Sequence, residues 1–169
     1  MRRHDREVTD ESQIVELINS CKAIRLGLRD GDDIYIVPLH FAHTMENGKH
    51  VFYCHGAAAG RKVDLIKSTG YAAFEMDGGQ ELITADTACD HSSTFYSVIG
   101  TSDASLVEDV EEKEKALNMI MHHYTGQHDW DYPEAMLKAT SVFKLVAREL
   151  SCKVKMKEGH QYRPPYFSV

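Results

Sequence analysis

A basic pair stands between a loop of small residues and a helix-like run, in the order VFYCH, GAAAG, Arg61, Lys62 and VDLIK. The first N–H groups of a helix have no intrahelical partner and lie at the positive end of its dipole, which favours an anion. Arg61 can hold two phosphate oxygens, and Lys62 adds a point charge. We therefore predict a phosphate-binding loop at Gly60, Arg61 and Lys62. The alternative is a solvated first helical turn without a ligand, although cations are slightly unfavourable there.

Histidine is abundant, with ten residues in the chain. His40 and His43 would point to opposite faces of a strand, and adjacent His122 and His123 cannot share one metal from one helix face. A metal site would need ligands that converge from distant segments, and we predict none. His55 stands apart because it ends a strand directly before the predicted phosphate loop. The other histidines are expected to be exposed or hydrogen-bonded.

Other catalytic motifs receive no support from the sequence. Cys54 and His55 are neighbours on a strand and so point to opposite sides, which excludes them as a nucleophile and its base. Ser92 and Ser93 lie outside any Gly-x-Ser-x-Gly motif. Rossmann and Walker glycine motifs are absent from the sequence, and the four scattered cysteines form no CxxC pair. Reduced thiols are therefore expected.

Composition predicts one globular domain of 169 residues, since 43% of them are apolar and 27% are charged. The net charge of −7 argues against nucleic acid or anionic lipid as a partner. No apolar run approaches the roughly 18 residues of a membrane span, and the N-terminus has no apolar signal-peptide core. We expect a cytoplasmic protein.

The hydrophobic pattern predicts an α+β fold on a small antiparallel barrel, with about six strands and flanking helices. Asp10 with Gln13 predicts a capped helix that ends near Cys21. Runs at 23–30, 34–43 and 49–55, the last two joined by Asn47-Gly48, predict a three-stranded meander. Pro38 should mark an edge, a bulge or a place where something other than a strand meets the backbone. Later elements are expected as helices at 61–69, 110–124 and 134–138, strands at 71–77, 81–85, 94–107 and 141–150, and an extended arm from about 152.

Two longer stretches carry a family resemblance. IVPLHFAHTMENGKHVFYCHGAAAGRKVDLIK and FYSVIGTSDASLVEDVEEKEKALNMIMHHYTG resemble the nitroimidazole-resistance (Nim) proteins, within the pyridoxamine 5′-phosphate oxidase-like split-barrel flavoproteins. The markers are the VPL strand, the YxHxAxxGxK-like loop, the SVIG strand and the HYTG helix end, over about residues 1–125.

The resemblance implies a homodimer of split barrels with FMN in two interface clefts. Gly60, Arg61 and Lys62 match the family's phosphate loop, and His55 matches the Nim histidine near the flavin and substrate. Ser97 matches a strand position that commonly faces the cofactor. The strand whose backbone runs beside the flavin ring is matched by Val37, Pro38, Leu39 and His40.

Two positions depart from the family pattern. Tyr96 replaces an Arg of many relatives, and the segment from Gly100 lacks their Gly-x-Gly-x-Ala, so a cofactor contact on this strand is in question. Trp130 and Tyr132 are candidates for the dimer interface or equally for the core.

The resulting expectation is an FMN-dependent oxidoreductase that moves electrons from NAD(P)H to a small acceptor such as a nitroaromatic. His55, with an unperturbed pKa of about 6.5, would be a hydrogen-bond donor or proton source. The alternatives are a flavin carrier or sensor without turnover and a haem-binding split barrel.

Overall fold

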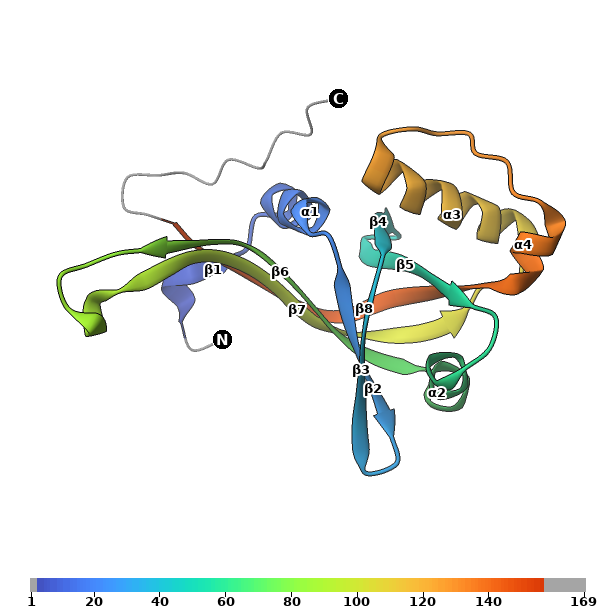
Figure 1. Ribbon diagram of the computed structural model, residues 1–169, viewed down its shortest axis with the longest axis horizontal. Coiled ribbons are helices and arrows are strands. Elements are labelled where there is room, and N and C mark those ends of the chain that lie inside the picture. The colour runs from blue at the N-terminus through green and yellow to red at the C-terminus, as the bar shows by residue number, and fades with distance from the viewer. Residues whose placement is uncertain (1–2, 157–169) are drawn as a thin grey trace.

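The structure is a computed structural model that describes residues 3–156. Within them, one antiparallel sheet has the strand order β3-β2-β6-β7-β8-β5-β4, and β1 pairs with β8 (Figure 1). The predicted α+β organisation is confirmed. The strands are β1 (Glu7–Val8), β2 (Ile24–Asp30), β3 (Asp33–Leu39), β4 (Phe41–Glu46), β5 (Lys49–Ala57), β6 (Tyr71–Ile83), β7 (Ser92–Leu106) and β8 (Thr140–Lys155). The helices are α1 (Glu11–Ser20), α2 (Arg61–Thr69), α3 (Val110–Thr125) and α4 (Glu134–Ala139).

The barrel closes through a direct passage from β3 to β4. These strands lie at opposite ends of the strand order, yet only His40 separates them in the chain. The sheet must therefore curl until its two ends meet. Among the described pairings, β3 joins β2 and β4 joins β5, and no ladder connects β3 with β4. The result is a split barrel.

This arrangement corrects the predicted meander. The run 34–43 is two strands in two separate hairpins, because the chain leaves the first ladder directly after Pro38 and Leu39 and enters the second at Phe41. Proline has no N–H to donate, so a ladder can end beside it at little cost. Of the three alternatives expected for Pro38, the structure shows a sheet edge, since β3 is the terminal strand on its side of the sheet.

The helix boundaries follow their predicted signals. Asp10 accepts a hydrogen bond from the Gln13 backbone N–H at 2.9 Å and so caps α1. Gly60 precedes α2, and Gly70 ends it in the left-handed conformation. Gly126 ends α3 in the same way. In both C-caps the positive φ favours glycine.

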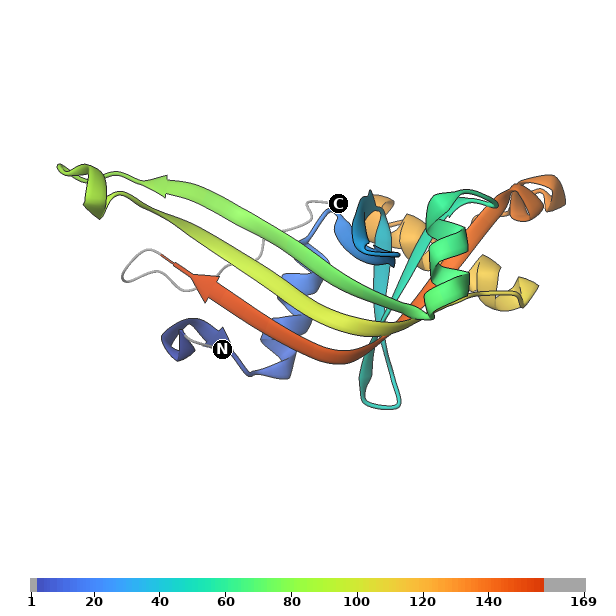
Figure 2. The same cartoon turned by 90° about the horizontal axis from the view of Figure 1, so that it is seen from below.

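Two strands are longer than predicted. β6 is continuous through Ile83, with a bulge between Gly78 and Glu81 where two strands were expected. β8 runs to Lys155, so the predicted arm does not begin at Cys152, which is buried and pairs with Val98 and Val8. Residues 157–169 of that arm lie outside the described part of the chain. The β6–β7 hairpin reaches away from α3 and α4, as Figure 2 also shows.

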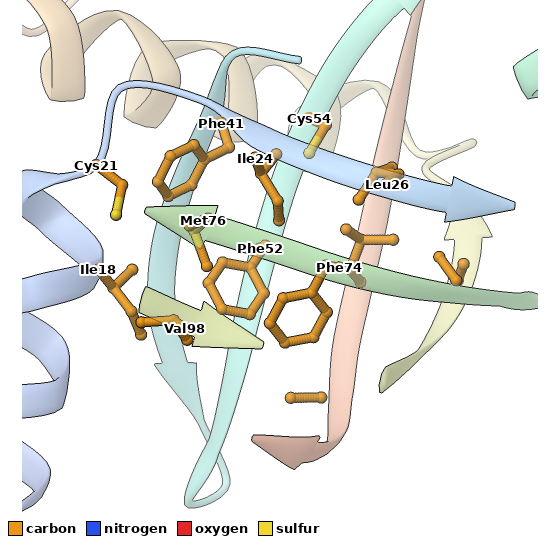
Figure 3. Packing of buried hydrophobic residues seen from close by; sticks show 14 of the residues in the cluster. Ile18, Cys21, Ile24, Leu26, Phe41, Phe52, Cys54, Phe74, Met76 and Val98 are labelled. Atoms are coloured by element: carbon orange, nitrogen blue, oxygen red, sulfur yellow. The ribbon is translucent and has the colours of Figure 1, made fainter. Parts of the chain in front are cut away.

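The main hydrophobic core fills the barrel and is closed by α1 and α2. Phe52 lies at its centre, with ring centroids 6.2 Å from Phe41 and 5.0 Å from Phe74 (Figure 3). A second cluster packs α3 and α4 against the other face of β4, β5 and β8. β5 therefore has one core on each side. Among the described helices, none is long and apolar enough to cross a bilayer.

Candidate functional site

The start of α2 presents backbone N–H groups beside an exposed loop. The N–H groups of Val63 and Asp64 both bond to the Gly60 carbonyl, at 2.9 and 3.2 Å. The N–H groups of Arg61 and Lys62 come before the first bonds of the helix, so they have no partner within it. They lie at the positive end of the helix dipole. Gly60 has φ 124°, a conformation that side-chain-bearing residues rarely adopt. This geometry leaves room for an anion to approach the backbone at the start of α2.

Lys62 places its side chain against β5. A Cβ atom added at Gly56 would overlap Lys62 Cε and lie 3.0 Å from its Nζ, so the glycine makes room for the lysine. The Lys62 side chain is half-buried. Among residues 3–156, no carboxylate lies within 4.0 Å of its ammonium group. The charge is therefore available to an external anion.

Arg61, the other half of the basic pair, already has protein partners. Its Nε donates to Asp30 Oδ2 at 2.7 Å, and its guanidinium lies 4.6 Å from the Tyr35 ring centre. The helix start is thus tied to the turn between β2 and β3. An anion at this loop would have to share the Arg61 guanidinium with Asp30. The Lys62 ammonium group has no such carboxylate to share among the described residues.

His55 has an unsatisfied buried atom. Its Nδ1 is buried without a hydrogen-bond partner in the described structure. Burial lowers the pKa of His55, and nearby His40 and Lys62 lower it further. The imidazole is therefore held neutral at neutral pH. Buried polar atoms are rarely left unpaired, so a ligand is a natural partner for this nitrogen.

The Cys54 thiol is on the opposite face of β5 from His55, as predicted. It is fully buried in the barrel core, and burial raises the pKa of the thiol. A thiol that stays protonated is a poor nucleophile.

The end of β3 approaches His55 through His40. The His40 ring centre is 6.2 Å from that of His55 and 4.5 Å from that of Tyr124 in α3. Val37 and Leu39 pack against the barrel core, while Pro38 is exposed. This part of β3 can therefore offer its backbone edge to a ligand, rather than the side chains of Val37 and Leu39.

Ser97 is far from the other predicted site residues. It pairs with Lys153 of β8, whereas His55 pairs with Val142 of the same strand. These partners are 11 positions apart (142 to 153), or roughly 35 Å along the strand. Within one chain, Ser97 and His55 cannot contact the same small ligand group.

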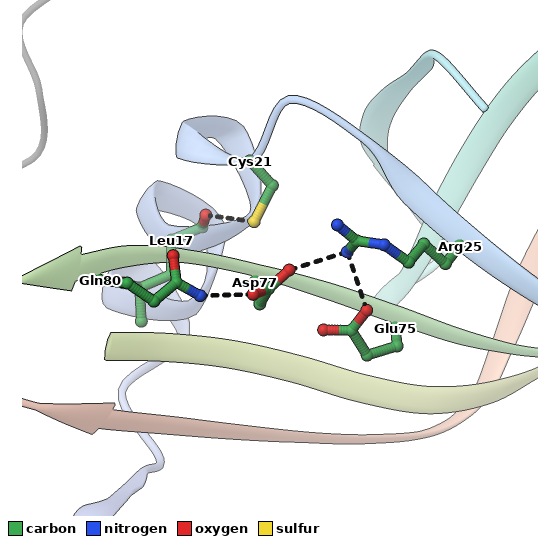
Figure 4. A network of polar contacts seen from close by, with 6 residues as sticks. All are labelled: Leu17, Cys21, Arg25, Glu75, Asp77 and Gln80. Carbon is green, nitrogen blue, oxygen red and sulfur yellow. Dashed lines mark hydrogen bonds and ion pairs between the residues drawn. The ribbon is translucent and has the colours of Figure 1, made fainter. Parts of the chain in front are cut away.

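A polar network that the sequence did not reveal lies around Asp77 (Figure 4). Ser97 pairs with Asp77 of β6. Arg25 Nη1 donates to Asp77 at 2.7 Å and to Glu75 at 3.0 Å, and Gln80 donates to Asp77 as well. The surroundings of Ser97 therefore contain two carboxylates already bonded to one arginine.

Tyr96, which departs from the family pattern, lies on the core side of the sheet. Its side chain is buried, and its hydroxyl donates to the Ser20 carbonyl at 3.3 Å. The ring covers Gly78 and Gly79, where a Cβ atom would overlap it. Tyr96 thus anchors the sheet to α1 on the core side, while Ser97 faces the other way.

The residues brought together are therefore His40, His55 and Lys62, with Gly60 and Arg61 adjoining. Tyr124 joins them against His40; the only sequence signal for it is its place in the HYTG motif. In the described part of the chain, no group of three His, Cys, Asp or Glu side chains is arranged to hold a metal.

Comparisons with known proteins identify the fold and the family. A candidate 5-nitroimidazole antibiotic resistance protein from Bacteroides thetaiotaomicron is 26% identical over 88% of this chain and 86% of its own, with a TM-score of 0.75. The flavocytochrome Anf3 from Azotobacter vinelandii is 20% identical over 93% and 72%, with a TM-score of 0.76. An FAD- and haem-binding protein from Mycobacterium smegmatis is 13% identical over 93% and 77%, with a TM-score of 0.78.

The last two structures, at these identities, show a shared fold alone. No curated protein matches the chain. Residues 10–154 match the family described as pyridoxamine 5′-phosphate oxidase, a region that includes the barrel, the α2 loop and His55. On that match, the chain belongs to the pyridoxamine 5′-phosphate oxidase family.

Proposed function

We propose that this protein is an FMN-dependent oxidoreductase of the Nim type, which moves electrons from NAD(P)H to a small acceptor such as a nitroaromatic. One observation carries the proposal: the buried, unpartnered Nδ1 of His55 lies beside an uncompensated lysine at the start of a helix. Family membership and the 26% identical candidate resistance protein add to it.

The residues fit a flavin mononucleotide. A phosphate at the start of α2 would meet the Lys62 ammonium group and the free N–H groups that follow Gly60. The flavin ring would then extend toward the backbone edge of Val37 to His40, with His55 Nδ1 as a polar contact. In this arrangement the ligand satisfies the buried Nδ1 of His55, which has no hydrogen-bond partner in the described structure.

When bound, FMN supplies hydride acceptance and electron transfer, and the protein supplies binding and orientation. Lys62 and Arg61 neutralise the phosphate, and Gly60 lets it approach the backbone. His55 holds or moves a proton at Nδ1 beside the acceptor. Because its pKa is lowered, the neutral imidazole is the resting form, and its first role is that of a hydrogen-bond partner.

Titration of FMN into the cofactor-free protein, followed by flavin fluorescence, tests the phosphate site. Charge-assisted hydrogen bonds contribute roughly 1.5–3 kcal/mol, so Lys62→Ala and Arg61→Ala should each weaken FMN about tenfold or more. Lys62→Ala should have the larger effect because Arg61 also has Asp30. Gly56→Ala keeps the charge but displaces the Lys62 side chain, and it should weaken FMN too.

Lys67→Ala, in the last turn of α2, is the matched control and should bind FMN normally. Unchanged affinity in both Lys62→Ala and Arg61→Ala would remove the phosphate assignment. An absorbance spectrum of the purified protein separates the alternatives: flavin bands agree with the proposal, while a Soret band would indicate haem instead.

We also propose a homodimer, in which a second copy brings its Ser97 to the flavin cleft. The distance between Ser97 and His55 within one chain favours this arrangement. Ile34, Ile36 and Ile99 are 66%, 65% and 51% exposed and give the sheet an apolar outer surface. Trp130, 39% exposed, stays an interface candidate, whereas Tyr132 packs in the second core. Light scattering should give twice the 19.1 kDa chain mass, and a single-chain mass would reject the dimer.

A further inference from the structure

A second histidine-rich region borders a pocket away from the α2 loop. The pocket has a volume of about 790 Å³ and lies between the end of α1, β4, α3 and the loop after α3. Pockets of about 300–1,000 Å³ are typical of small-molecule sites. None of Gly60, Arg61, Lys62 or His55 lines it. Its inner wall includes Asn19, Ala42, His43, Met119, His123 and Tyr124.

The hydrogen-bond partners of His43 fix which of its nitrogens carries the proton. Glu11 Oε1 lies 3.0 Å from His50 Nε2, and a carboxylate accepts, so His50 carries its proton on Nε2. His50 is buried, and burial lowers its pKa, so its Nδ1 is left as an acceptor. That Nδ1 lies 2.9 Å from His43 Nε2, which must therefore donate. The remaining nitrogen of His43, Nδ1, carries a lone pair.

His123 follows the same logic from the other side of the pocket. Its Nε2 lies 3.0 Å from the Cys21 carbonyl oxygen, which can only accept, so Nε2 carries the proton. Its Nδ1 is therefore a second acceptor. Burial lowers the pKa of both histidines, and that of His43 falls to about 4. The inner wall is thus uncharged at neutral pH. At the rim, Lys115 and Asp129 are both exposed and carry opposite charges.

Aromatic and soft side chains make up much of the rest of the wall. The imidazoles of His43 and His123, the Tyr124 ring and the Met119 thioether offer flat or polarisable contacts. A wall with two neutral acceptors and several aromatic faces is complementary to a flat, uncharged ligand with a hydrogen-bond donor. An anion would find no cation on the inner wall.

We propose that this pocket is a second small-molecule site, which binds a neutral aromatic heterocycle or phenol whose N–H or O–H donates to His43 Nδ1. The Glu11–His50 pair acts as a positioning device, because it holds His43 in the tautomer that presents an acceptor. The site is separate from the phosphate loop, although Tyr124 in its wall also contacts His40.

Indole and 1-methylindole are suitable probes because they share one ring system and differ in the donor N–H. Their affinities for the full chain are measured by calorimetry at pH 7.5, with and without saturating FMN. Indole should bind about tenfold more tightly than 1-methylindole, since a buried acceptor left unpaired is costly. His43→Phe keeps an aromatic ring but removes the acceptor, and it should abolish this preference. His91→Gln, in the β6–β7 hairpin, should retain it.

Equal binding of the two probes, no binding of indole, or a preference that survives in His43→Phe would each overturn the proposal. If His43→Phe does not fold, ¹⁵N NMR of the wild-type imidazoles decides. Nδ1 of His43 should show the shift of an unprotonated nitrogen and should move on addition of indole but not of 1-methylindole. A protonated Nδ1, or no response to indole, would also overturn it. Loss of FMN binding in the Lys62→Ala protein should leave the indole preference unchanged, so the two proposals fail independently.

Discussion

Two histidines on opposite faces of β5 have opposite hydrogen-bonding states. His50 lies on the barrel side and is bonded at both nitrogens, to Glu11 and to His43. His55 lies on the other side and keeps a buried Nδ1 without a partner in the described residues. A buried polar atom left unpaired costs roughly 1–3 kcal/mol. The strand thus holds one imidazole by protein contacts and leaves the other ready for a ligand.

This difference in hydrogen bonding indicates that some histidines have a structural role and others a functional one. The His43–His50 pair ties β4 and β5 to α1 and, apart from the ligand contact proposed for His43 Nδ1, should matter most for stability and its pH dependence. His55, near Lys62 and His40, should matter most for flavin chemistry. Each prediction below tests one side of this division.

The largest effect is expected on acid stability. Burial and neighbouring His50 and His123 lower the pKa of His43 from 6.5 to about 4. As the pH falls below 6.5, His43 becomes protonated in the unfolded chain but stays neutral in the folded chain. Its contribution to the free energy of unfolding is therefore fully present above pH 6.5 and is lost progressively between pH 6.5 and about pH 4. The fall in pKa corresponds to about 3 kcal/mol. Urea unfolding from pH 7.5 to 4 should show this loss.

The control for acid stability is the difference between variants, because carboxylates also titrate in this range and burial lowers the pKa of other histidines as well. His43→Phe should have a flatter pH profile than the wild type, even if its stability at pH 7.5 is lower. His91→Gln, an exposed histidine in the hairpin loop, should keep the wild-type profile. Parallel profiles for His43→Phe and the wild type would show that His43 titrates normally.

The next effect concerns His55. His55→Ala should leave FMN affinity within a few-fold but slow reoxidation of the reduced flavin by a nitroaromatic about 10²-fold, the scale of general acid catalysis. Stopped-flow absorbance measures this rate, with His91→Ala as the matched control. A parallel loss of FMN affinity would show that His55 acts through cofactor binding and not through proton transfer to the acceptor. Wild-type rates in the variant would favour a flavin carrier without turnover.

Local signals in the sequence predicted the local structure well. The Asp10 cap, Gly60 and Gly70 around α2, and the Asn47-Gly48 hairpin lie where the pattern placed them. Each depends on contacts within a few residues, which a sequence pattern records directly. The loop's small residues likewise predicted that a helix begins directly after Gly60.

Long-range placement could not be predicted in the same way. The run through Pro38 looked like one strand, because periodicity does not say which neighbour a strand pairs with. The pairing of Arg61 with Asp30 and the Glu11–His50–His43 series join residues that only the closed barrel brings together. The roughly 35 Å between Ser97 and His55 along β8 likewise depends on strand register.

The smallest effect is expected at Glu11, whose side chain is 61% exposed. Glu11 raises the pKa of His50, against the lowering by burial. Glu11→Gln keeps an oxygen that can accept from His50 Nε2 but removes the charge, so the tautomer of His43 should persist while the pKa of His50 falls further. Exposed ion pairs contribute less than about 1 kcal/mol, so stability at pH 7.5 should barely change. Glu11→Ala removes both the charge and the acceptor, which should allow His50 and His43 to exchange tautomers. NMR titration of the two imidazoles would distinguish these outcomes, and a tautomer of His43 that is the same in Glu11→Ala as in the wild type would show that Glu11 does not set it.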